Sequence, residues 1–216
     1  MPVKIVCMGD SITVGQFVSP SLRWTSLIER MLAVKYGPDT VELRNHGLNG
    51  ETSRGALERF PVTVQAEEPR IVTLQYGMND CNCWSSDRGV NRVSLTAFKA
   101  NLTEMIERSR RFGAHDVILC TNHRSLRRAR MESGETYEEA NARYSDAVLD
   151  VALETRATLC DFRAEFSELV DSQLSPLLLP APDGLHLSET GHVAYADILF
   201  PHLDAAIAAR AVLEAR

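Results

Sequence analysis

The sequence predicts an α/β fold in which a doubly wound parallel sheet of five strands carries helices on both faces. Short apolar runs alternate with longer amphipathic segments along the chain, and this alternation is typical of repeated strand–helix–strand units. A length of 216 residues and a hydrophobic share of 44% are those of a globular chain that buries a sizeable core. No repeat or linker divides the sequence, so we expect one domain over residues 1–216.

The first part of the chain predicts two strands and the helix between them. Val3–Met8 is an apolar run that ends at a glycine, as expected of a buried strand. Ser21–Tyr36 is expected to be helical because its apolar residues fall on one face, and Gly37-Pro38 follows as a stop signal. Val41–Asn45 predicts a second strand, which is short and partly polar.

The middle of the chain predicts a third strand between two helices. A turn at Gly47–Gly50 leads into a helix over Ser53–Phe60, and the apolar run Ile71–Tyr76 is expected to form the strand. The periodic pattern is lost over Cys81–Arg92, which we interpret as a loop. Helical spacing returns over Leu95–Phe112.

The last part of the chain predicts two more strands and two more helices. Asp116–Thr121 is expected to be the fourth strand, and the polar stretch Asn122–Gly134 a second long loop. Tyr137–Arg156 predicts a helix and Thr158–Phe162 a short fifth strand. The closing helix is expected from Leu187 to the C-terminus.

The charge balance and the apolar runs exclude some classes of partner. The chain has 23 Lys+Arg and 29 Asp+Glu, a net charge of −6, which argues against a nucleic-acid partner bound through a global positive field. No apolar run approaches the ~20 residues that span a bilayer, and the N-terminus lacks the regions of a signal peptide. We therefore expect a cytoplasmic protein with no membrane partner.

Motifs for phosphate, dinucleotide and zinc chemistry are missing from the sequence. Gln16 stands where a P-loop would need lysine, no G-x-G-x-x-G follows a strand, and no H-E-x-x-H occurs. The G-x-S-x-G elbow is missing as well. Cys81 and Cys83 lack the C-x-x-C spacing of a structural zinc site. We expect no metal and no organic cofactor.

The candidate nucleophile is Ser11, which directly follows the first predicted strand. Glycines at positions 9 and 15 allow the backbone to turn sharply there and to present the hydroxyl. A serine needs a positioned base at neutral pH, and His186 is the candidate. Asp183, three residues earlier on a turn, can hold the imidazole in the tautomer that leaves Nε2 for Ser11.

Attack on an acyl carbon creates an oxyanion, which requires donors aimed at one point. Gly50 and Asn79 both follow predicted strands or turns at the carboxyl edge of the sheet. They can supply a backbone N–H and a side-chain amide, and the N–H of Ser11 can join them. The sequence therefore predicts an oxyanion hole of Ser11, Gly50 and Asn79.

Four blocks of the sequence resemble the GDSL, or SGNH, hydrolases, whose marker residues are Ser, Gly, Asn and His. Each block alone is a weak signal, but together, in order and at strand ends, they form a strong one. One departure is isoleucine in place of the leucine of the family name, a conservative apolar exchange. The blocks are Gly9–Ile12 (GDSI), Asn45–Thr52 (NHGLNGET), Gly77–Asp80 (GMND) and Asp183–His186 (DGLH).

The resemblance covers essentially the whole chain and implies both a fold and a set of roles. The fold is a flavodoxin-like three-layer α/β/α sandwich, in agreement with the strands predicted independently. The implied roles are nucleophile for Ser11, oxyanion donors for Gly50 and Asn79, base for His186 and orienting acid for Asp183.

The loops after the third and fourth predicted strands should frame the substrate. Trp84 lies in the first, and Arg124 opens a cluster of four arginines in the second. Because guanidinium groups suit carboxylates and phosphates, Arg124 is a candidate for binding an anionic or sugar-like leaving group; a solvated charge run is the alternative. Asp10 is a third candidate for substrate binding, although it and Asp80 also fit residues that cap the adjacent loops.

The predicted activity is hydrolysis of a small-molecule ester through an acyl-enzyme intermediate. Only 6% of the residues are aromatic, and no long apolar lid segment is found, which favours short acyl groups such as acetyl on a small alcohol or carbohydrate. Two alternatives stay open. An acyltransferase would use the same residues, and a flavodoxin-like binding module would have no catalytic function. His192, near the start of the closing helix, is interpreted as a capping or packing residue near the site.

Overall fold

One parallel sheet organises the chain. A computed structural model describes the backbone of residues 2–214 and the side chains of residues 2–209, and its five strands lie in the order β2-β1-β3-β4-β5. Every neighbouring pair is parallel, so the predicted α/β sandwich with a five-stranded parallel sheet is confirmed. The strands are β1 (Val3–Gly9), β2 (Val41–Gly47), β3 (Ile71–Gln75), β4 (Asp116–Cys120) and β5 (Thr158–Cys160).

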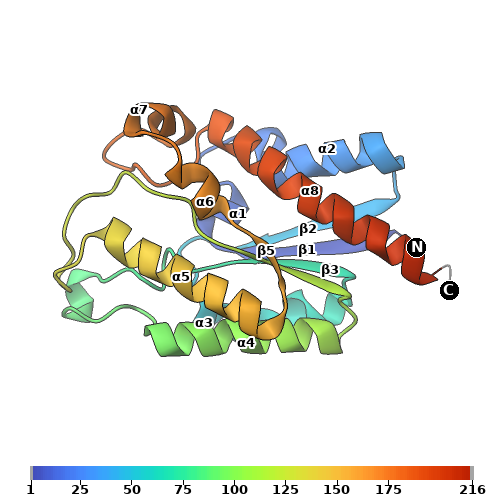
Figure 1. Ribbon diagram of the computed structural model, residues 1–216, viewed down its shortest axis with the longest axis horizontal. Coiled ribbons are helices and arrows are strands. Elements are labelled where there is room, and N and C mark those ends of the chain that lie inside the picture. Colours follow the sequence, from blue (N-terminus) through green and yellow to red (C-terminus); the bar gives the residue numbers. More distant parts are fainter. Residues whose placement is uncertain (1, 215–216) are drawn as a thin grey trace.

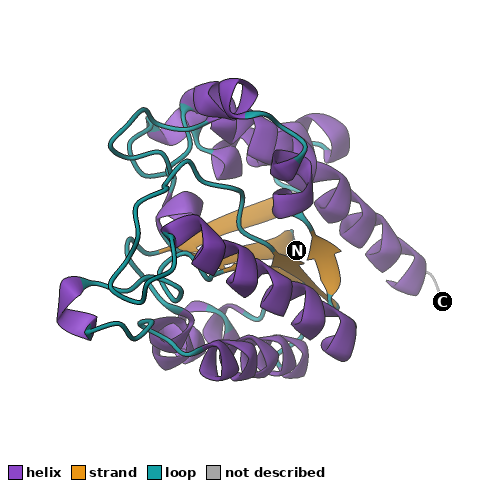
Figure 2. Cartoon of the chain, turned by 60° about the vertical axis from the view of Figure 1, so that its left-hand side comes forward, coloured by secondary structure: helices purple, strands orange, loops and turns teal. Residues whose placement is uncertain are grey.

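Helices cover both faces of this sheet, as Figures 1 and 2 show. Helices α2 and α8 pack together on one face, and α3, α4 and α5 line the other. All of β3 and all of β1 except Lys4 are buried, as expected of strands covered on both sides. The helices are α2 (Trp24–Tyr36), α3 (Ser53–Thr63), α4 (Leu95–Arg111), α5 (Tyr137–Thr155) and α8 (Glu189–Glu214).

The segments that follow the strands all lie at one edge of the sheet, because the strands are parallel. This edge is at the left of Figure 1, where the helix α1 and the long loops gather. Ligands of open α/β sheets bind at such an edge. The expected position of the site at the carboxyl ends of the strands follows from this topology.

Short helices are the main difference from the predicted elements. Helix α1 (Ser11–Val14) was expected to be a loop, and the predicted helix over Ser21–Tyr36 is split. Pro20–Leu22 forms a separate 3₁₀ turn, and Arg23 is extended before α2 begins. Proline favours the first turn of a helix and prevents continuation from the preceding residue.

The predicted fifth strand was too long. It ends at Cys160 because the side chain of Asp161 accepts a hydrogen bond from the backbone of Ala164 and caps α6 (Phe162–Ser167). A second short helix, α7 (Asp171–Leu174), was also missed. One or two turns carry too few residues for a periodic pattern, and the remaining boundaries differ from the predicted ones by a few residues.

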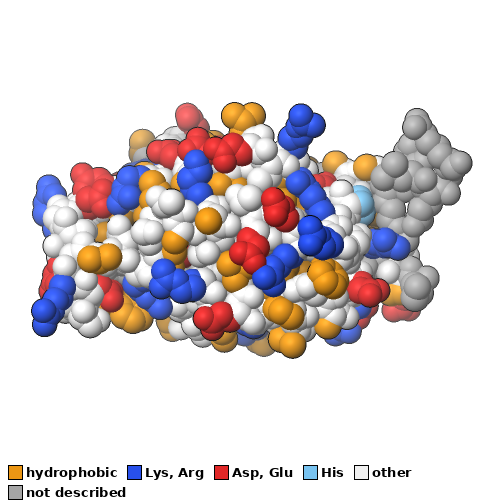
Figure 3. All heavy atoms as spheres, turned by 90° about the horizontal axis from the view of Figure 1, so that it is seen from below, with side chains coloured by type: hydrophobic (Ala, Val, Ile, Leu, Met, Phe, Trp, Pro, Cys, Tyr) orange, Lys and Arg blue, Asp and Glu red, His pale blue; other side chains and the backbone are white. Residues whose placement is uncertain are grey.

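Two features of the structure concern the expected lack of nucleic-acid and membrane partners: the surface charge and the apolar character of the helices. On the face that Figure 3 shows, acidic and basic side chains are interspersed, and neither sign dominates. Among residues 2–214, no helix is both long and apolar enough to cross a membrane.

Candidate active site

The turn after β1 places Ser11 at the start of α1. Gly9 is required there by packing, because a Cβ would lie 2.1 Å from Thr13 Oγ1 and 2.9 Å from the carbonyl oxygen of Gln75. Asp10 then caps α1, with its Oδ1 accepting from the Ile12 backbone N–H at 2.9 Å. Ser11 is the first helical residue, and its side chain lies at the edge of the sheet.

Ser11, His186 and Asp183 form a continuous chain of hydrogen bonds. His186 Nε2 is 2.9 Å from Ser11 Oγ, and His186 Nδ1 is 2.8 Å from Asp183 Oδ2. The structure thus brings Ser11 to His186, which lies 175 positions later in the sequence. This is the geometry in which a serine hydroxyl donates its proton to an imidazole held by a carboxylate.

The Asp183 carboxylate is stabilised in its ionised form. Its Oδ1 accepts from the backbone N–H groups of Leu185 at 2.9 Å and His186 at 2.7 Å. Partial burial acts to raise the pKa of Asp183, but the hydrogen bonds from His186 and Leu185 outweigh it, so the pKa is lowered. An ionised acceptor fixes a proton on Nδ1 of His186 and leaves Nε2 free to accept.

A buried polar relay that the sequence did not predict ties this turn to the sheet. Gln75 Nε2 donates to Tyr195 Oη at 3.0 Å, Tyr195 Oη lies 2.5 Å from His123 Nδ1, and His123 Nε2 lies 2.7 Å from the carbonyl oxygen of Leu185. Burial lowers the pKa of His123 to about 4, so the ring is neutral. Because a carbonyl only accepts, Nε2 carries the proton and Nδ1 accepts from Tyr195. The available signal was a histidine three residues after the end of β4.

Two further neighbours of the Asp183–His186 turn were not predicted. Arg127 Nε donates to the carbonyl oxygen of Asp183 at 2.7 Å, and its Nη2 lies 3.6 Å from Asp183 Oδ2. The ring of Phe17 meets the ring of His186 edge-on at 5.0 Å. Phe17 is 63% exposed and has a φ of 73°, a conformation that costs a non-glycine residue energy. Arg127 thus contacts the acid of the turn, and Phe17 contacts the imidazole.

The predicted oxyanion donors lie at the same sheet edge. Asn79 Nδ2 donates one hydrogen to Asp10 Oδ2 at 3.0 Å, which leaves its second N–H for a ligand. Gly50 has a φ of +74°, and nothing lies within 4 Å of the position its Cβ would take. The turn that carries Gly50 is tied to the end of β1, because Leu48 N donates to Gly9 O at 3.0 Å.

Buried ion pairs and hydrogen bonds fix the Gly50 turn from the C-terminal side. Arg59 holds the Glu51 carboxylate with two nitrogens, both at 2.5 Å, and Tyr76 Oη donates to the same carboxylate at 2.9 Å. Asp80 Oδ1 accepts from the backbone N–H of Ser53 at 2.9 Å and from its hydroxyl at 2.5 Å. Asp80 was expected to cap the loop next to it; in these contacts it instead holds the first residue of α3, whose N-cap is Thr52.

Two of the three predicted substrate-binding residues are engaged elsewhere. Asp10 is 1% exposed, and its oxygens hold Ile12 N and Asn79 Nδ2, so it acts behind the site as a cap. Burial and the nearby Asp80 carboxylate raise the pKa of Asp10 to about 7, against the opposing effect of the hydrogen bond from Ile12. Arg124 donates to the carbonyl oxygen of Leu169 at 2.6 Å and pairs with Asp171.

The third predicted residue, Trp84, is 51% exposed. The guanidinium of Arg92 lies over its ring at 4.1 Å, and Arg92 Nη1 donates to the carbonyl oxygen of Gly50 at 3.1 Å. The loop that carries Trp84 therefore contacts the turn at Gly50 through Arg92, a residue that the sequence did not single out.

His192 packs next to the site, as interpreted from the sequence. It is 1% exposed in the first turn of α8, and its Nδ1 accepts from the backbone N–H of Trp24 at 3.3 Å. Trp24 Nε1 donates in turn to the carbonyl oxygen of Ile12 at 3.0 Å. His192 thus joins the start of α2 to the helix that presents the candidate nucleophile.

The buried His192 ring predicts a specific acid sensitivity. Burial, followed by the charge of Arg23, lowers the pKa of His192 from 6.5 to about 4. Between these pH values His192 is protonated in the unfolded chain and neutral in the folded chain. Protonation therefore favours the unfolded chain, and the unfolding free energy falls by about 3 kcal/mol through this group as the pH drops from 7 to 4.

The variant His192→Asn keeps an acceptor for Trp24 and removes the titration. We expect its unfolding free energy to approach that of the wild type as the pH falls, in urea titrations at several pH values from 7 to 4. The difference in unfolding free energy between the two proteins at pH 7, where His192 is mostly neutral in both states, measures the loss of packing and serves as the internal control. Parallel pH curves for the two proteins would show that His192 does not resist protonation.

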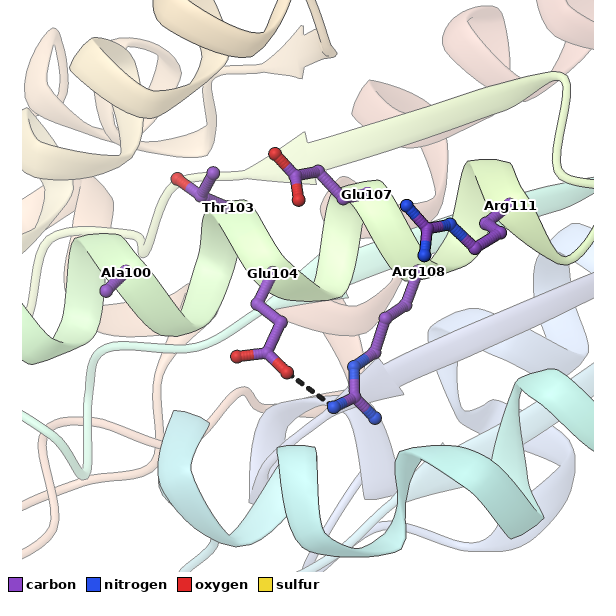
Figure 4. Close-up of a pocket in the computed structure, with 6 residues that line it drawn as sticks. All are labelled: Ala100, Thr103, Glu104, Glu107, Arg108 and Arg111. Carbon is purple, nitrogen blue, oxygen red and sulfur yellow. Dashed lines mark ion pairs between the residues drawn. The ribbon is translucent and has the colours of Figure 1, made fainter.

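Away from the strand ends, the surface has a hollow along α4 (Figure 4). Its lining side chains come from that helix alone, and Glu104 and Arg108 pair with each other across one turn at 2.5 Å. It contains no histidine, serine or cysteine, so it offers none of the chemistry found at the strand ends. The lining residues are Ala100, Thr103, Glu104, Glu107, Arg108 and Arg111.

Comparisons with known proteins agree with this geometry. The model of the GDSL-like Lipase/Acylhydrolase family matches residues 7–194. The chain is 29% identical over 115 residues to Esterase TesA of Pseudomonas aeruginosa, a match of 53% of this chain and 52% of that protein, so it spans about half of the relative's length. It is 25% identical over 212 residues to the acetylxylan esterase of Geobacillus stearothermophilus, covering 89% and 90% of the two chains.

A solved structure extends the likeness to nearly the whole chain. The lipase/acylhydrolase from Enterococcus faecalis superposes with a TM-score of 0.76 at 26% identity, covering 95% of this chain and 96% of that one. The resemblance noted from the four sequence blocks therefore extends to the arrangement of strands and helices.

Proposed function

The chain belongs to the GDSL-like lipase/acylhydrolase family, a family of carboxylic ester hydrolases, and we propose that it cleaves short-chain acyl esters of a small alcohol or carbohydrate. The observation that supports this is the chain of contacts from Ser11 Oγ to His186 Nε2 at 2.9 Å and from His186 Nδ1 to Asp183 at 2.8 Å. It supplies a nucleophile, a base and a group that orients the base.

The reaction would proceed in two displacements. His186 Nε2 takes the hydroxyl proton as Ser11 Oγ attacks the acyl carbon, and the imidazolium then gives the proton to the leaving alcohol. The acyl group stays on Ser11. A water molecule, deprotonated by His186, attacks the ester so formed and releases the acid.

Three donors would stabilise the tetrahedral intermediate of each step. They are the backbone N–H groups of Ser11 and Gly50 and the second Nδ2–H of Asn79. Asp10 orients the Asn79 amide through its hydrogen bond at 3.0 Å, so the donor is in place before charge develops. Such preorganised donors contribute on the order of 10²–10³ in kcat each.

The preference for short acyl groups is supported by composition and by the names of relatives. Aromatic residues are 6% of the chain, and one relative that matches along most of its length is an acetylxylan esterase. An arylesterase of Vibrio mimicus is 27% identical over 116 residues, about half of each chain. These names concern those proteins; for this chain, acetyl-like substrates are part of the proposal.

A series of 4-nitrophenyl esters from acetate to decanoate tests the proposal. We expect kcat/KM to be highest for acetate or butyrate and to fall about tenfold or more by octanoate. With an added alcohol acceptor, free acid should remain the main product. A maximum at decanoate would contradict the short-chain preference, dominant transfer to the acceptor would indicate an acyltransferase, and lack of turnover with every ester would favour a binding module.

A further inference from the structure

Arg92 is held at the edge of the candidate active site by three contacts. Its backbone N–H donates to the carbonyl oxygen of Asn82 at 2.9 Å, its guanidinium lies 4.1 Å above the Trp84 ring, and Nη1 donates to the carbonyl oxygen of Gly50 at 3.1 Å. Gly50 is the residue whose backbone N–H is proposed to bind the oxyanion. The guanidinium is therefore hydrogen-bonded to the residue that we propose as an oxyanion donor.

Among the described side chains, the guanidinium of Arg92 has no carboxylate partner, since none of their Asp or Glu oxygens lies within ion-pair distance of it. Two other arginines of the strand-end region do have such partners, since Arg59 pairs with Glu51 and Arg124 pairs with Asp171. Arg92 is thus a partly exposed cation with most of its N–H donors uncommitted.

Stacking on Trp84 prepares this cation for binding. An arginine loses side-chain entropy when it binds a ligand, and one already held over an aromatic ring has lost part of it beforehand. The planar fork then presents parallel N–H groups that match a carboxylate or a phosphate. Cation–π contact with the indole also stabilises the charge where it is only partly hydrated.

We propose that Arg92, stacked on Trp84, binds a carboxylate or phosphate carried by the ester substrate, so that the enzyme prefers anionic esters. This rests on the proposed esterase function and names the substrate class of that site. The anionic group can belong to the acyl part or to the alcohol part of the ester. Arg92 therefore takes the place of Arg124 as the arginine proposed to bind substrate, because both terminal nitrogens of Arg124 already have partners.

Matched pairs of esters test the charge preference on each part. For the alcohol part, the pair is 4-acetoxybenzoate and its neutral methyl ester; for the acyl part, it is 4-nitrophenyl hydrogen adipate and 4-nitrophenyl methyl adipate. At low salt we expect the wild type to prefer the anionic member of at least one pair by about tenfold in kcat/KM. Added NaCl should reduce that preference, since salt screens exposed charges.

The variant Arg92→Gln separates two roles of Arg92: binding of the substrate's anionic group and support of the Gly50 turn. We expect it to lose about tenfold in kcat/KM for the preferred anionic ester, mainly through KM, together with the salt dependence. Its loss for the neutral partner should be several-fold smaller, and Arg92→Lys should fall between the two proteins. Arg124→Gln is the matched control and should show the wild-type preference.

The outcomes distinguish this proposal from the function on which it rests. Equal losses on the anionic and neutral esters in Arg92→Gln would show that Arg92 only holds Gly50, and would overturn the proposal. Hydrolysis of the neutral esters without any preference for charge would also overturn it, while the esterase function would stand. Failure of the wild type to hydrolyse all four esters would contradict the esterase function itself.

Discussion

Replacement of Ser11 by alanine is expected to lower kcat/KM by roughly 10⁴-fold or more, because the attacking atom is removed. KM should change much less, since the hydroxyl forms no bond to the substrate before attack. The measurement is steady-state hydrolysis of 4-nitrophenyl acetate. Because Ser11 and His186 act as one unit at 2.9 Å, the double variant Ser11→Ala/His186→Ala should be no slower than Ser11→Ala alone.

The control for this loss is a serine outside the site. Ser172 is exposed in α7, and Ser172→Ala should keep wild-type kcat/KM. Thermal unfolding of Ser11→Ala should lie within a few degrees of the wild type, since its hydroxyl has His186 as its partner and no structural bond. Activity of Ser11→Ala within tenfold of the wild type would exclude Ser11 as the nucleophile.

Asp183→Asn is expected to lower kcat by about 10⁴-fold while leaving the fold intact. The asparagine oxygen can still accept from the backbone N–H groups of Leu185 and His186, now at 2.9 and 2.7 Å from the carboxylate. Its amide nitrogen would face His186 Nδ1 and donate to it. The imidazole proton would then lie on Nε2, where it points at Ser11 and blocks acceptance of the hydroxyl proton.

Asp171→Asn is the matched control for the loss of a carboxylate. Asp171 is exposed and pairs with Arg124 and Arg128, so its variant should keep kcat near the wild-type value. Asp183→Ala adds a second readout, because it removes the support of the turn as well as the tautomer control. A decrease of less than tenfold in Asp183→Asn would show that the carboxylate does not set the state of His186.

The strands and the meeting of Ser11, His186 and Asp183 could be predicted because their signals are local. A buried parallel strand is a nearly continuous apolar run, and each of the four family blocks lies within a few residues of a strand end or turn. Topology supplies the rest, because parallel strands place their carboxyl ends at one edge. This is why Ser11 and His186, far apart in sequence, could be predicted to meet.

The parts that could not be predicted depend on tertiary partners. The sequence around His123 gives no sign of a structural role, because its ring partners, Tyr195 and the carbonyl oxygen of Leu185, lie far away in the sequence. Arg124 was a candidate for substrate binding, with a solvated charge run as the alternative. It pairs with Asp171, while Arg92 lies over Trp84 and contacts the turn at Gly50. Which arginine finds an acidic partner is a property of the fold, and side-chain type alone does not decide it.

Some expectations from the sequence stay predictions. These are the single domain over residues 1–216, the cytoplasmic location and the roles of the site residues. The oxyanion role of Gly50 and Asn79 belongs with them, although the structure gives a reason for both residues: Gly50 has a φ of +74° at an open position, and Asn79 is oriented by Asp10.

Labelling with a fluorophosphonate probe tests the central claim most directly, because the probe reacts much faster with a serine activated by a base than with an ordinary serine. We expect a single adduct in the intact mass, located by peptide mapping on Ser11, with loss of esterase activity in proportion to labelling. Ser11→Ala should take up no probe, and Asp183→Asn should react far more slowly. Full esterase activity with Ser11 unlabelled, or an adduct on another residue that accounts for the lost activity, would contradict the claim.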